Sequence, residues 1–275
     1  MRRSVSRRRR SISNHEKTPQ AEAEPDQSRH TRADFDPWKC RGKLENLGDG
    51  SMTVLYPGCV YRYKQRDILK RYENLLDAIG VDYRKIDELK CCGIPLRNAG
   101  YSDDFKEIAK FNADLMNKYK VTEIIVLCPE CHRMIASKYK KYAFLPSEVK
   151  VHFVVNYLLE KLPANSKTSI NVTYQDSCYL GRRSGYYDEP RELINKFGYS
   201  IIEAENTREE SICCGGGGNV REQNYELSEA VAESRVDEFM KTKAEFIVTN
   251  CPHCYVCLSN KGMPVKDISE LYHPN

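Results

Sequence analysis

At 275 residues, with 40% hydrophobic residues and a formal net charge of +4, the chain can bury one large core or two ordinary ones. Its twelve cysteines are about 4% of the chain, below the roughly 8–10% of small disulfide-built secreted domains, and no run approaches the roughly 18 apolar residues of a membrane span. These features exclude a disulfide-built miniprotein and a membrane span. Because polar residues follow the N-terminal arginines where a signal sequence needs an apolar stretch, we expect a cytoplasmic protein.

Residues 1–50 are expected to form a flexible basic arm. Six of the first ten residues are arginine, and the remainder of this segment is polar and without hydrophobic periodicity. Short basic blocks are usually solvated chain ends, so no nucleic-acid partner is expected. Cys40 lies in this arm and is assigned no role.

Strand-like and helix-like segments alternate after residue 50. Hydrophobic patterning predicts strands over residues 52–56, 81–86 and 123–127, helices over residues 64–79 and 103–119, the second capped by Ser102, and a further helix whose first turn contains Pro129. Alternating strands and helices of these lengths predict an α/β, Rossmann-like domain with a mostly parallel sheet covered on both faces.

The same pattern begins again after residues 163–166. Strands are predicted over residues 170–175, 199–204 and 245–249, and helices over residues 190–197 and 221–241. The cysteines repeat with nearly constant offsets, 119 from Cys59 to Cys178 and 123 from Cys128 to Cys251. We therefore expect two tandem, pseudo-symmetric cysteine-rich domains, residues 51–165 and 166–275.

Each half carries five cysteines with nearly the same spacing, a single cysteine, an adjacent pair and a Cys-Pro-x-Cys element. If each of these follows a strand, all three loops meet at the carboxyl edge of the parallel sheet, where open α/β sheets bind ligands. Cys-Pro-x-Cys at a helix N-terminus also favours the thiolate, because the positive end of the helix dipole lies there. The candidate metal ligands are Cys59, Cys91, Cys92, Cys128 and Cys131, and Cys178, Cys213, Cys214, Cys251 and Cys254.

Glycines follow both cysteine pairs, and we expect them to contact a cofactor. Gly93 follows the first pair, and Gly215, Gly216 and Gly217 follow the second. Without a side chain, such positions let the backbone pass close to a bulky inorganic cluster. A phosphate-binding loop is disfavoured because no Gly-Lys-Ser/Thr follows.

Zinc and iron–sulfur clusters are both open as the bound group. Zinc takes four ligands in a tetrahedron, whereas each half offers five thiols, two of them adjacent. Iron–sulfur clusters are held by thiolates, and a fifth thiolate suggests a departure from a simple four-cysteine cube. The residues therefore favour iron–sulfur clusters, with zinc possible in one site.

These motifs, over residues 52–275, resemble the cysteine-rich CCG proteins. That family includes the B-type subunit of the CoB–CoM heterodisulfide reductases, the C-terminal half of their D-type subunit, and iron–sulfur subunits of glycolate oxidation. The resemblance is carried by the repeated five-cysteine spacing and by Asp176-Ser177-Cys178-Tyr179-Leu180-Gly181-Arg182 and Cys213-Cys214-Gly215-Gly216-Gly217-Gly218. One departure is Ser177, where many relatives have proline.

The resemblance implies that each set of five cysteines binds a noncubane [4Fe-4S] cluster. It further implies that the two clusters face each other across the domain interface and pass electrons to, or from, a bound disulfide. The expected function is that of an oxidoreductase component, a heterodisulfide-reductase-like enzyme active only with partners. Because the repeated four-cysteine motif of ferredoxin domains is missing before Cys59, a ferredoxin-like iron–sulfur subunit or a flavoprotein is expected to supply electrons.

Two alternatives remain. An electron-transfer subunit would relay electrons between a flavin dehydrogenase and a quinone or flavoprotein without its own substrate, and a zinc-stabilised interaction module would contain no iron. Cys257 extends the second Cys-Pro-x-Cys element, and we interpret it as a small buried residue rather than a sixth ligand. His132 and His253 are candidate proton or hydrogen-bond donors, although capping or surface roles are favoured.

Overall fold

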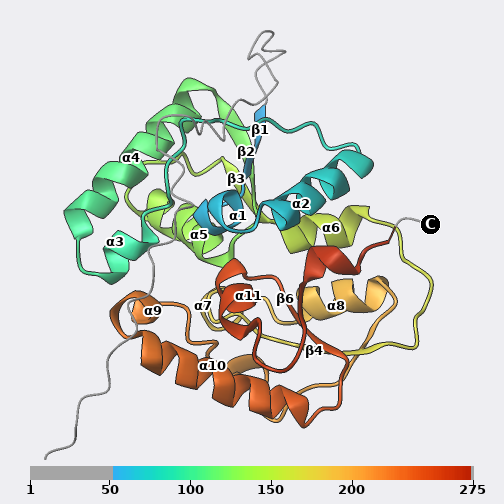
Figure 1. Cartoon of the computed structure of the whole chain (residues 1–275). Helices are drawn as coiled ribbons and strands as arrows, with labels where there is room; N and C mark the ends of the chain where they lie inside the picture. Colours follow the sequence, from blue (N-terminus) through green and yellow to red (C-terminus); the bar gives the residue numbers. More distant parts are fainter. Residues whose placement is uncertain (1–51, 274–275) are drawn as a thin grey trace, which may run out of the picture. The chain divides into compact units, whose positions relative to one another are not determined.

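The computed structural model describes residues 52–273, which lie within one compact unit, and the predicted basic arm with Cys40 lies outside the described residues. The first half contains a parallel three-stranded sheet of order β1-β2-β3 (Figure 1). Its strands are β1 (Met52–Tyr56), β2 (Val121–Val126) and β3 (Lys150–Phe153). Ile124, Ile125 and Val126 are fully buried, as expected for a parallel strand covered on both faces.

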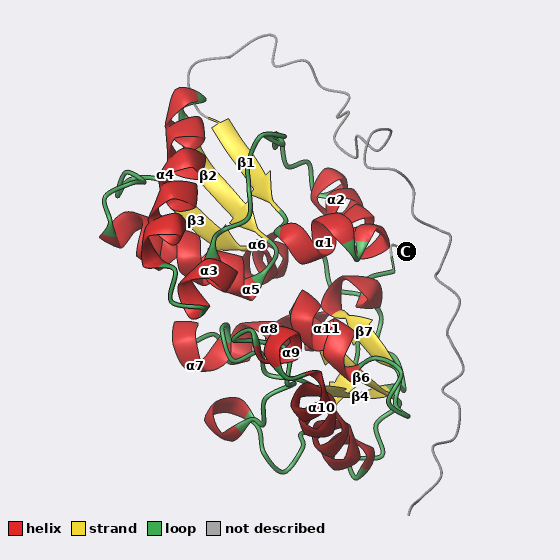
Figure 2. Ribbon diagram, turned by 60° about the vertical axis from the view of Figure 1, so that its left-hand side comes forward, coloured by secondary structure: helices red, strands yellow, loops and turns green. Residues whose placement is uncertain are grey.

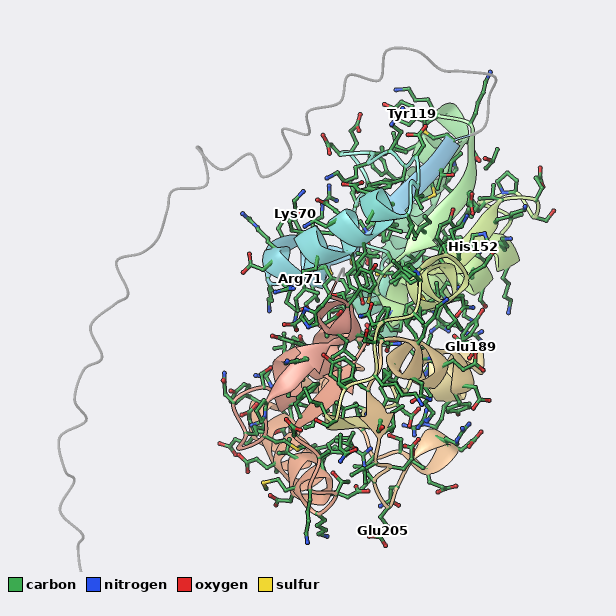
Figure 3. The ribbon with its side chains drawn as sticks, turned by 90° about the vertical axis from the view of Figure 1, so that its right-hand side faces the viewer. Lys70, Arg71, Tyr119, His152, Glu189 and Glu205 are labelled. Carbon is green, nitrogen blue, oxygen red and sulfur yellow. The ribbon has the colours of Figure 1, made fainter. Side chains whose placement is uncertain are left out.

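Helices connect these strands and cover the sheet. They are α1 (Cys59–Tyr63), α2 (Arg66–Ala78), α3 (Ile94–Asn98), α4 (Ser102–Lys118), α5 (Pro129–Arg133), continued by a π-helical segment over Met134–Tyr139, and α6 (Val154–Lys161). In α2 the apolar positions fall on one side of the helix, so Tyr72 and Leu76 are buried whereas Lys70 and Arg71 are exposed (Figure 3).

The second half contains a parallel four-stranded sheet of order β5-β4-β6-β7. Its strands are β4 (Asn171–Tyr174), β5 (Ser200–Ile201), β6 (Phe246–Thr249) and β7 (Val265–Asp267). The helices are α7 (Gly181–Ser184), α8 (Asp188–Lys196), α9 (Val220–Gln223), α10 (Tyr225–Met240) and α11 (Pro252–Leu258), with 3-10 turns over Arg208–Glu210 and Ile268–Leu271.

The two sheets confirm the predicted tandem α/β fold. In β1-β2-β3 and β4-β6-β7 the strands have the same order and direction (Figure 2). Every strand pair in the described residues is parallel. Within residues 52–273 we find no helix with the length and apolarity that a bilayer crossing requires.

The strand predicted over residues 81–86 is wrong. Only Arg84 pairs with β1, through the hydrogen bonds Leu55 N to Arg84 O and Arg84 N to Thr53 O, both 2.9 Å. In the second half the corresponding segment, predicted as residues 199–204, forms only the two-residue strand β5. Both segments lie at a sheet edge, where one neighbouring strand holds them, so the pairing ends quickly.

Two helix boundaries also differ from prediction. Ser102 does not cap α4; it is the first helical residue, and Tyr101 precedes it without a side-chain cap. The helix predicted over residues 221–241 is interrupted at Asn224, whose Oδ1 accepts a hydrogen bond of 3.0 Å from Leu227 N and so caps α10. Local capping thus divides a segment that hydrophobic patterning treats as continuous.

One hydrophobic core extends across both halves. The first-half core residues form one cluster with residues of β4, α8 and the C-terminal turn, including Val172, Leu193, Phe197 and Leu271. The turn over Ile268–Leu271 packs against α2. Tyr61 Oη donates a hydrogen bond of 2.8 Å to Asp267 Oδ2, linking α1 to the end of β7.

Asp267 should make stability depend on pH. It is fully buried, and this burial raises the pKa of its carboxyl to about 6, above the value of about 3.9 in an unfolded chain. The folded state therefore binds more protons between about pH 4 and pH 6, so its free energy of unfolding falls as the pH rises through this window. Asp267→Asn removes the titrating group. Between pH 4 and pH 6 the free energy of unfolding of this variant should therefore fall by about 3 kcal/mol less than that of the wild type.

Chemical denaturation of both proteins at pH 4, 5, 6 and 7 measures this effect. The difference in unfolding free energy between wild type and Asp267→Asn should change between pH 4 and pH 6 and then level off. Parallel profiles would show that Asp267 titrates normally in the fold.

Candidate functional site

Four of the predicted cysteine ligands lie directly after a strand. Cys59 begins α1 after β1, Cys128 precedes α5 after β2, Cys178 follows β4, and Cys251 precedes α11 after β6. Pro129 and Pro252 occupy the first turn of their helices, so the Cys-Pro-x-Cys elements lie at helix N-termini as predicted. Both sites therefore lie at the carboxyl edge of a sheet.

The adjacent cysteine pairs differ from this expectation, because neither follows a strand directly. Cys91 and Cys92 come after an irregular segment, and Cys213 and Cys214 follow the loop after the turn Arg208–Glu210. Hydrogen bonds hold the first of these loops instead. Asn112 Oδ1 accepts from Lys90 N (2.8 Å), Asn112 Nδ2 donates to Cys91 O (3.1 Å), and Tyr139 Oη donates to Cys92 O (3.2 Å).

The five thiols of the first half form one connected chain. Neighbouring side chains are hydrogen bonded in the order Cys59, Cys91, Cys92, Cys131, Cys128. Cys92, Cys128 and Cys131 are buried, and all five are free thiols. We call this set the first thiol cluster.

The second half repeats this chain in the equivalent order. Its hydrogen-bonded thiols run Cys178, Cys213, Cys214, Cys254, Cys251, and we call this set the second thiol cluster. Cys257 forms a branch, because its thiol contacts Cys214. It is buried, with 2% of its surface exposed, which agrees with the sequence interpretation, but it lies beside the cluster rather than elsewhere in the core.

The thiols cannot all ionise on their own. Hydrogen bonds from Cys59 and Cys92 lower the pKa of Cys91 to about 3, and those from Cys178 and Cys214 lower the pKa of Cys213 to about 2. The same contacts, together with burial, raise the pKa of Cys59 and Cys178. Cys91 is the thiol with a lowered pKa in the first cluster, whereas in the second half the pKa is lowered for Cys213, Cys254 and Cys257. Ionising the remaining thiols requires a cationic centre among them.

Three of the four glycines predicted to contact a cofactor are crowded by neighbouring protein atoms. A Cβ on Gly93 would meet the Phe105 ring at 2.8 Å, and one on Gly215 would collide with the backbone oxygen of Ser228, so both positions are set by helix packing. A Cβ on Gly216 would lie 2.5 Å from Cys257 Sγ. Gly217 is less crowded, since its nearest neighbour would be Glu130 Oε1 at 3.4 Å.

Gly58 is a residue that sequence reasoning missed. Its φ is +84°, and a Cβ there would lie 2.9 Å from Cys131 Sγ and 3.1 Å from Cys128 Cβ. The absence of a side chain therefore leaves room beside the first thiol cluster, as the close approach of a bulky inorganic group requires. Its position directly before Cys59 was the available signal.

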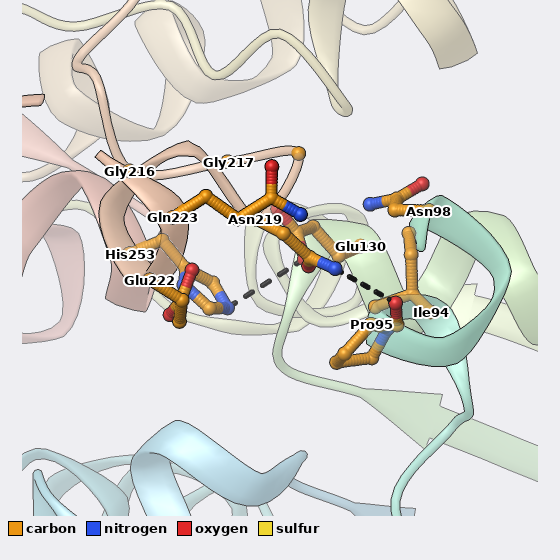
Figure 4. A pocket seen from close by; sticks show the side chains of 11 residues that line it. Ile94, Pro95, Asn98, Glu130, Gly216, Gly217, Asn219, Glu222, Gln223 and His253 are labelled. Atoms are coloured by element: carbon orange, nitrogen blue, oxygen red, sulfur yellow. Dashed lines mark hydrogen bonds and ion pairs between the residues drawn. The ribbon is translucent and has the colours of Figure 1, made fainter. Parts of the chain in front are cut away.

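A pocket of about 210 Å³ lies between the halves beside the clusters (Figure 4). Glu130 and His253 both line it, and each is the third residue of its Cys-Pro-x-Cys element, so they occupy equivalent positions of the repeat. Glu130 Oε2 and His253 Nε2 lie 3.6 Å apart, and burial raises the pKa of Glu130. Asn219 Nδ2 donates to Pro95 O at 2.9 Å and links the two walls.

His132 lies away from this pocket. It is buried, with ring contacts to Phe153 and Tyr186 at 5.7 and 5.8 Å between ring centroids, and burial lowers its pKa to about 4. His132 is therefore a neutral core histidine rather than a surface or capping residue. His253 alone of the two candidate histidines lies where it can contact a bound molecule.

Each half offers five free thiols, more than the four ligands of a tetrahedral metal ion. Within residues 52–273 no group of three or more His, Cys, Asp and Glu side chains is arranged to hold one metal ion. Five free thiols in a connected chain, three of them buried, with Gly58 leaving space beside them, are the donor set that an iron–sulfur cluster uses.

A buried ion pair positions the loop that carries Cys178. Arg191 on α8 donates to both carboxylate oxygens of Asp176, at 2.8 and 2.9 Å, and also pairs with Glu203. Arg208 N donates to Asp176 Oδ2 at 2.8 Å. The side chains of Arg191 and Asp176 are 8% and 3% exposed, so neither charge can be solvated if its partner is lost.

Arg191→Gln should lower the free energy of unfolding by about 3–5 kcal/mol, because it leaves the buried Asp176 without its countercharge. Arg208→Gln is the matched control, since its pair with Asp188 is exposed, and it should cost less than about 1 kcal/mol. Chemical denaturation of the three proteins at pH 7 gives both values. Equal losses in the two variants would contradict a structural role for the buried pair.

Comparison with known proteins places the chain in a family. The cysteine-rich domain family CCG matches residues 53–136 and again residues 172–259, more than half of the chain. The two matches contain both thiol clusters and Cys257. The chain belongs to the CCG cysteine-rich domain family, with two copies of the domain in tandem.

Relatives are redox proteins. The chain is 29% identical over 222 residues to the EtfAB:quinone oxidoreductase of Syntrophomonas wolfei, covering 75% of this chain and 31% of that protein. It is 30% identical over 220 residues to the D subunit of the dihydromethanophenazine:CoB–CoM heterodisulfide reductase of Methanosarcina acetivorans, with 76% and 53% covered. It is also 30% identical over 203 residues to an uncharacterized iron–sulfur protein of Methanococcus maripaludis, with 74% and 40% covered.

The chain thus spans about a third to a half of the length of these relatives. Among solved structures, a hypothetical protein from Helicobacter pylori superposes with a TM-score of 0.52 at 12% identity, covering 82% of this chain and 48% of that one. This likeness supports the fold alone. The sequence relationship is to iron–sulfur and redox subunits, as the resemblance predicted.

Proposed function

We propose that the chain is an iron–sulfur oxidoreductase subunit in which two four-iron clusters act together on a disulfide. The observation that carries the proposal is the repeated chain of five thiols, present in the same order in both halves beside one shared pocket. A relay of single electrons needs one centre, whereas cleaving a disulfide needs two electrons. A matched pair of sites therefore favours disulfide chemistry.

The two thiol clusters would hold the two centres. Each centre would supply one electron at a time to a molecule in the pocket between them. Five rather than four thiolates per site support the noncubane form that the family resemblance implies. The proposed ligands are Cys59, Cys91, Cys92, Cys128 and Cys131 in the first half, and Cys178, Cys213, Cys214, Cys251 and Cys254 in the second.

The pocket would bind and orient the disulfide. Reduction takes two electrons and two protons and releases two thiols, so polar groups must stand near both product sulfurs. Glu130 and His253 lie at equivalent positions on the two sides of the pocket, and Asn98 Nδ2, hydrogen bonded to Tyr179 Oη at 3.4 Å, lies at its edge. These side chains would orient a disulfide with one sulfur toward each half.

Partner subunits would supply the electrons. We propose a ferredoxin-like iron–sulfur subunit or a flavoprotein as the donor. The relatives named as a component of heterodisulfide reductase and as a quinone oxidoreductase support a place in a larger redox complex. The second of these names also supports the alternative of electron transfer toward a quinone without a disulfide substrate.

Metal analysis of anaerobically purified protein tests the proposal. We expect about eight irons and equal sulfide per chain, as two four-iron clusters require. About four irons with one zinc would leave one redox site and favour the relay function. Zinc without iron would contradict the redox proposal and favour a zinc-stabilised interaction module.

Gly58→Ala tests where the iron is held. The new Cβ would lie 2.9 Å from Cys131 Sγ, so iron at the first thiol cluster should be lost, about half of the chain's total, while the second cluster keeps its share. Gly80→Ala is the control, because Gly80 also has a positive φ, +71°, but no atom within 4 Å of the added Cβ. Full iron occupancy in Gly58→Ala would argue against a centre beside this glycine.

A further inference from the structure

Three positions that adjoin the cysteine ligands differ in polarity between the repeats. Gly58, before Cys59, corresponds to Ser177, before Cys178. Leu127, before Cys128, corresponds to Asn250, before Cys251, and Met134, three residues after Cys131, corresponds to Cys257, three residues after Cys254. The first thiol cluster is thus bordered by glycine and apolar side chains. The second is bordered by Ser177 and Asn250, which can donate hydrogen bonds, and by Cys257, whose Sγ accepts one from Arg221.

Two of these polar side chains are buried without partners. Asn250 is fully buried, and neither its Oδ1 nor its Nδ2 has a hydrogen-bond partner within the chain. Ser177 is 1% exposed, and its Oγ is also without one. Buried polar groups are nearly always hydrogen bonded, because leaving one unpaired costs about 1–3 kcal/mol. Both side chains adjoin a cysteine ligand of the second cluster, so a cluster bound there would provide the missing acceptors.

The third side chain, Cys257, is held against the second cluster by a cation. Arg221 Nη1 lies 3.7 Å from Cys257 Sγ and 2.6 Å from Glu229 Oε1. Lys261 Nζ pairs with Glu229 Oε2 at 2.7 Å, so one carboxylate is shared by two cations. Glu233 adds a more distant carboxylate, 3.8 Å from Lys261, and is mostly exposed. Cys257 in turn contacts Cys214 and fills the space left by Gly216.

We propose that Ser177, Asn250 and Cys257, the last held by Arg221, make the second site the more easily reduced of the two. The inference rests on the proposed function, because it concerns clusters at both sites. Hydrogen bonds to cluster or ligand sulfur, and positive charge nearby, stabilise the extra negative charge of the reduced form and raise the reduction potential. Gly58, Leu127 and Met134 offer the first site no such donors.

This difference in reduction potential sets the order in which the two centres are reduced. An electron that reaches the first site moves to the second with a favourable change in free energy, so the second site is reduced first and holds its electron. These four side chains are positioning residues, since they act on the reacting molecule only through the cluster. Removing them should leave both centres present but bring their potentials closer together.

Redox titration of the anaerobic full chain, followed by electron paramagnetic resonance, tests the inference. Wild type should show two separate midpoint potentials. Asn250→Leu and Cys257→Met install the first-half residues in the second half, and each should lower one midpoint and leave the other unchanged. Arg221→Gln keeps all the thiols and alters a side chain that is 25% exposed, so it should lower the same midpoint even if a core variant folds poorly.

Matched substitutions in the first half are the controls. Met134→Leu and Leu127→Val should leave both midpoints at wild-type values, whereas Leu127→Asn should raise the lower one. Equal midpoints in wild type, or variants that shift both midpoints or neither, would overturn the inference. Iron and sulfide analysis of the same samples separates this result from failure of the proposed function, because wild type would then hold fewer than about eight irons.

Discussion

Crowding of five thiols into one partly buried site is the constraint on which each half of the molecule depends. Thiols at hydrogen-bond distance share protons, so lowering the pKa of Cys91 and Cys213 is accompanied by raising the pKa of Cys59 and Cys178. Converting all five to thiolates is unfavourable unless positive charge is placed among them. The parallel sheet and the hydrogen bonds around it hold the sulfurs together against this cost, ready for a centre that supplies the charge.

The two halves hold their cysteine pairs by different means. In the first half, Asn112 and Tyr139 bind the backbone of the pair directly. In the second half, Ser228 Oγ donates to Gly215 O at 3.0 Å, and Arg235 links Gln175 on one side to Glu238 on the other. The helices that follow each pair, α4 and α10, supply contacts in both cases. Equivalent helices in the two halves therefore hold the cysteine pairs in place through different side chains.

The sequence was sufficient for the features that repeat. Apolar runs such as residues 123–127 specify buried parallel strands, and the constant cysteine offsets establish the duplication before any coordinates are known. The sequence was insufficient where a tertiary contact determines the local structure. The pairing of Arg84 ends after one residue, and a Cβ on Gly93 would meet the Phe105 ring at 2.8 Å. Neither contact leaves a local signal, because each joins segments that at least one helix separates in the sequence.

The contact between Glu130 and His253 could not be predicted from the local sequence either, for a related reason. His253 was a candidate donor from the sequence, but Glu130 was not, and their proximity is established only when the two repeats face each other across the pocket. Two copies of one charged residue at this place would put like charges about 4 Å apart, which is unfavourable when buried. A carboxylate facing an imidazole is instead attractive when the imidazole is protonated and hydrogen-bond compatible when it is neutral. Duplication places equivalent positions in contact, and it is the difference between the two residues that makes the contact stable.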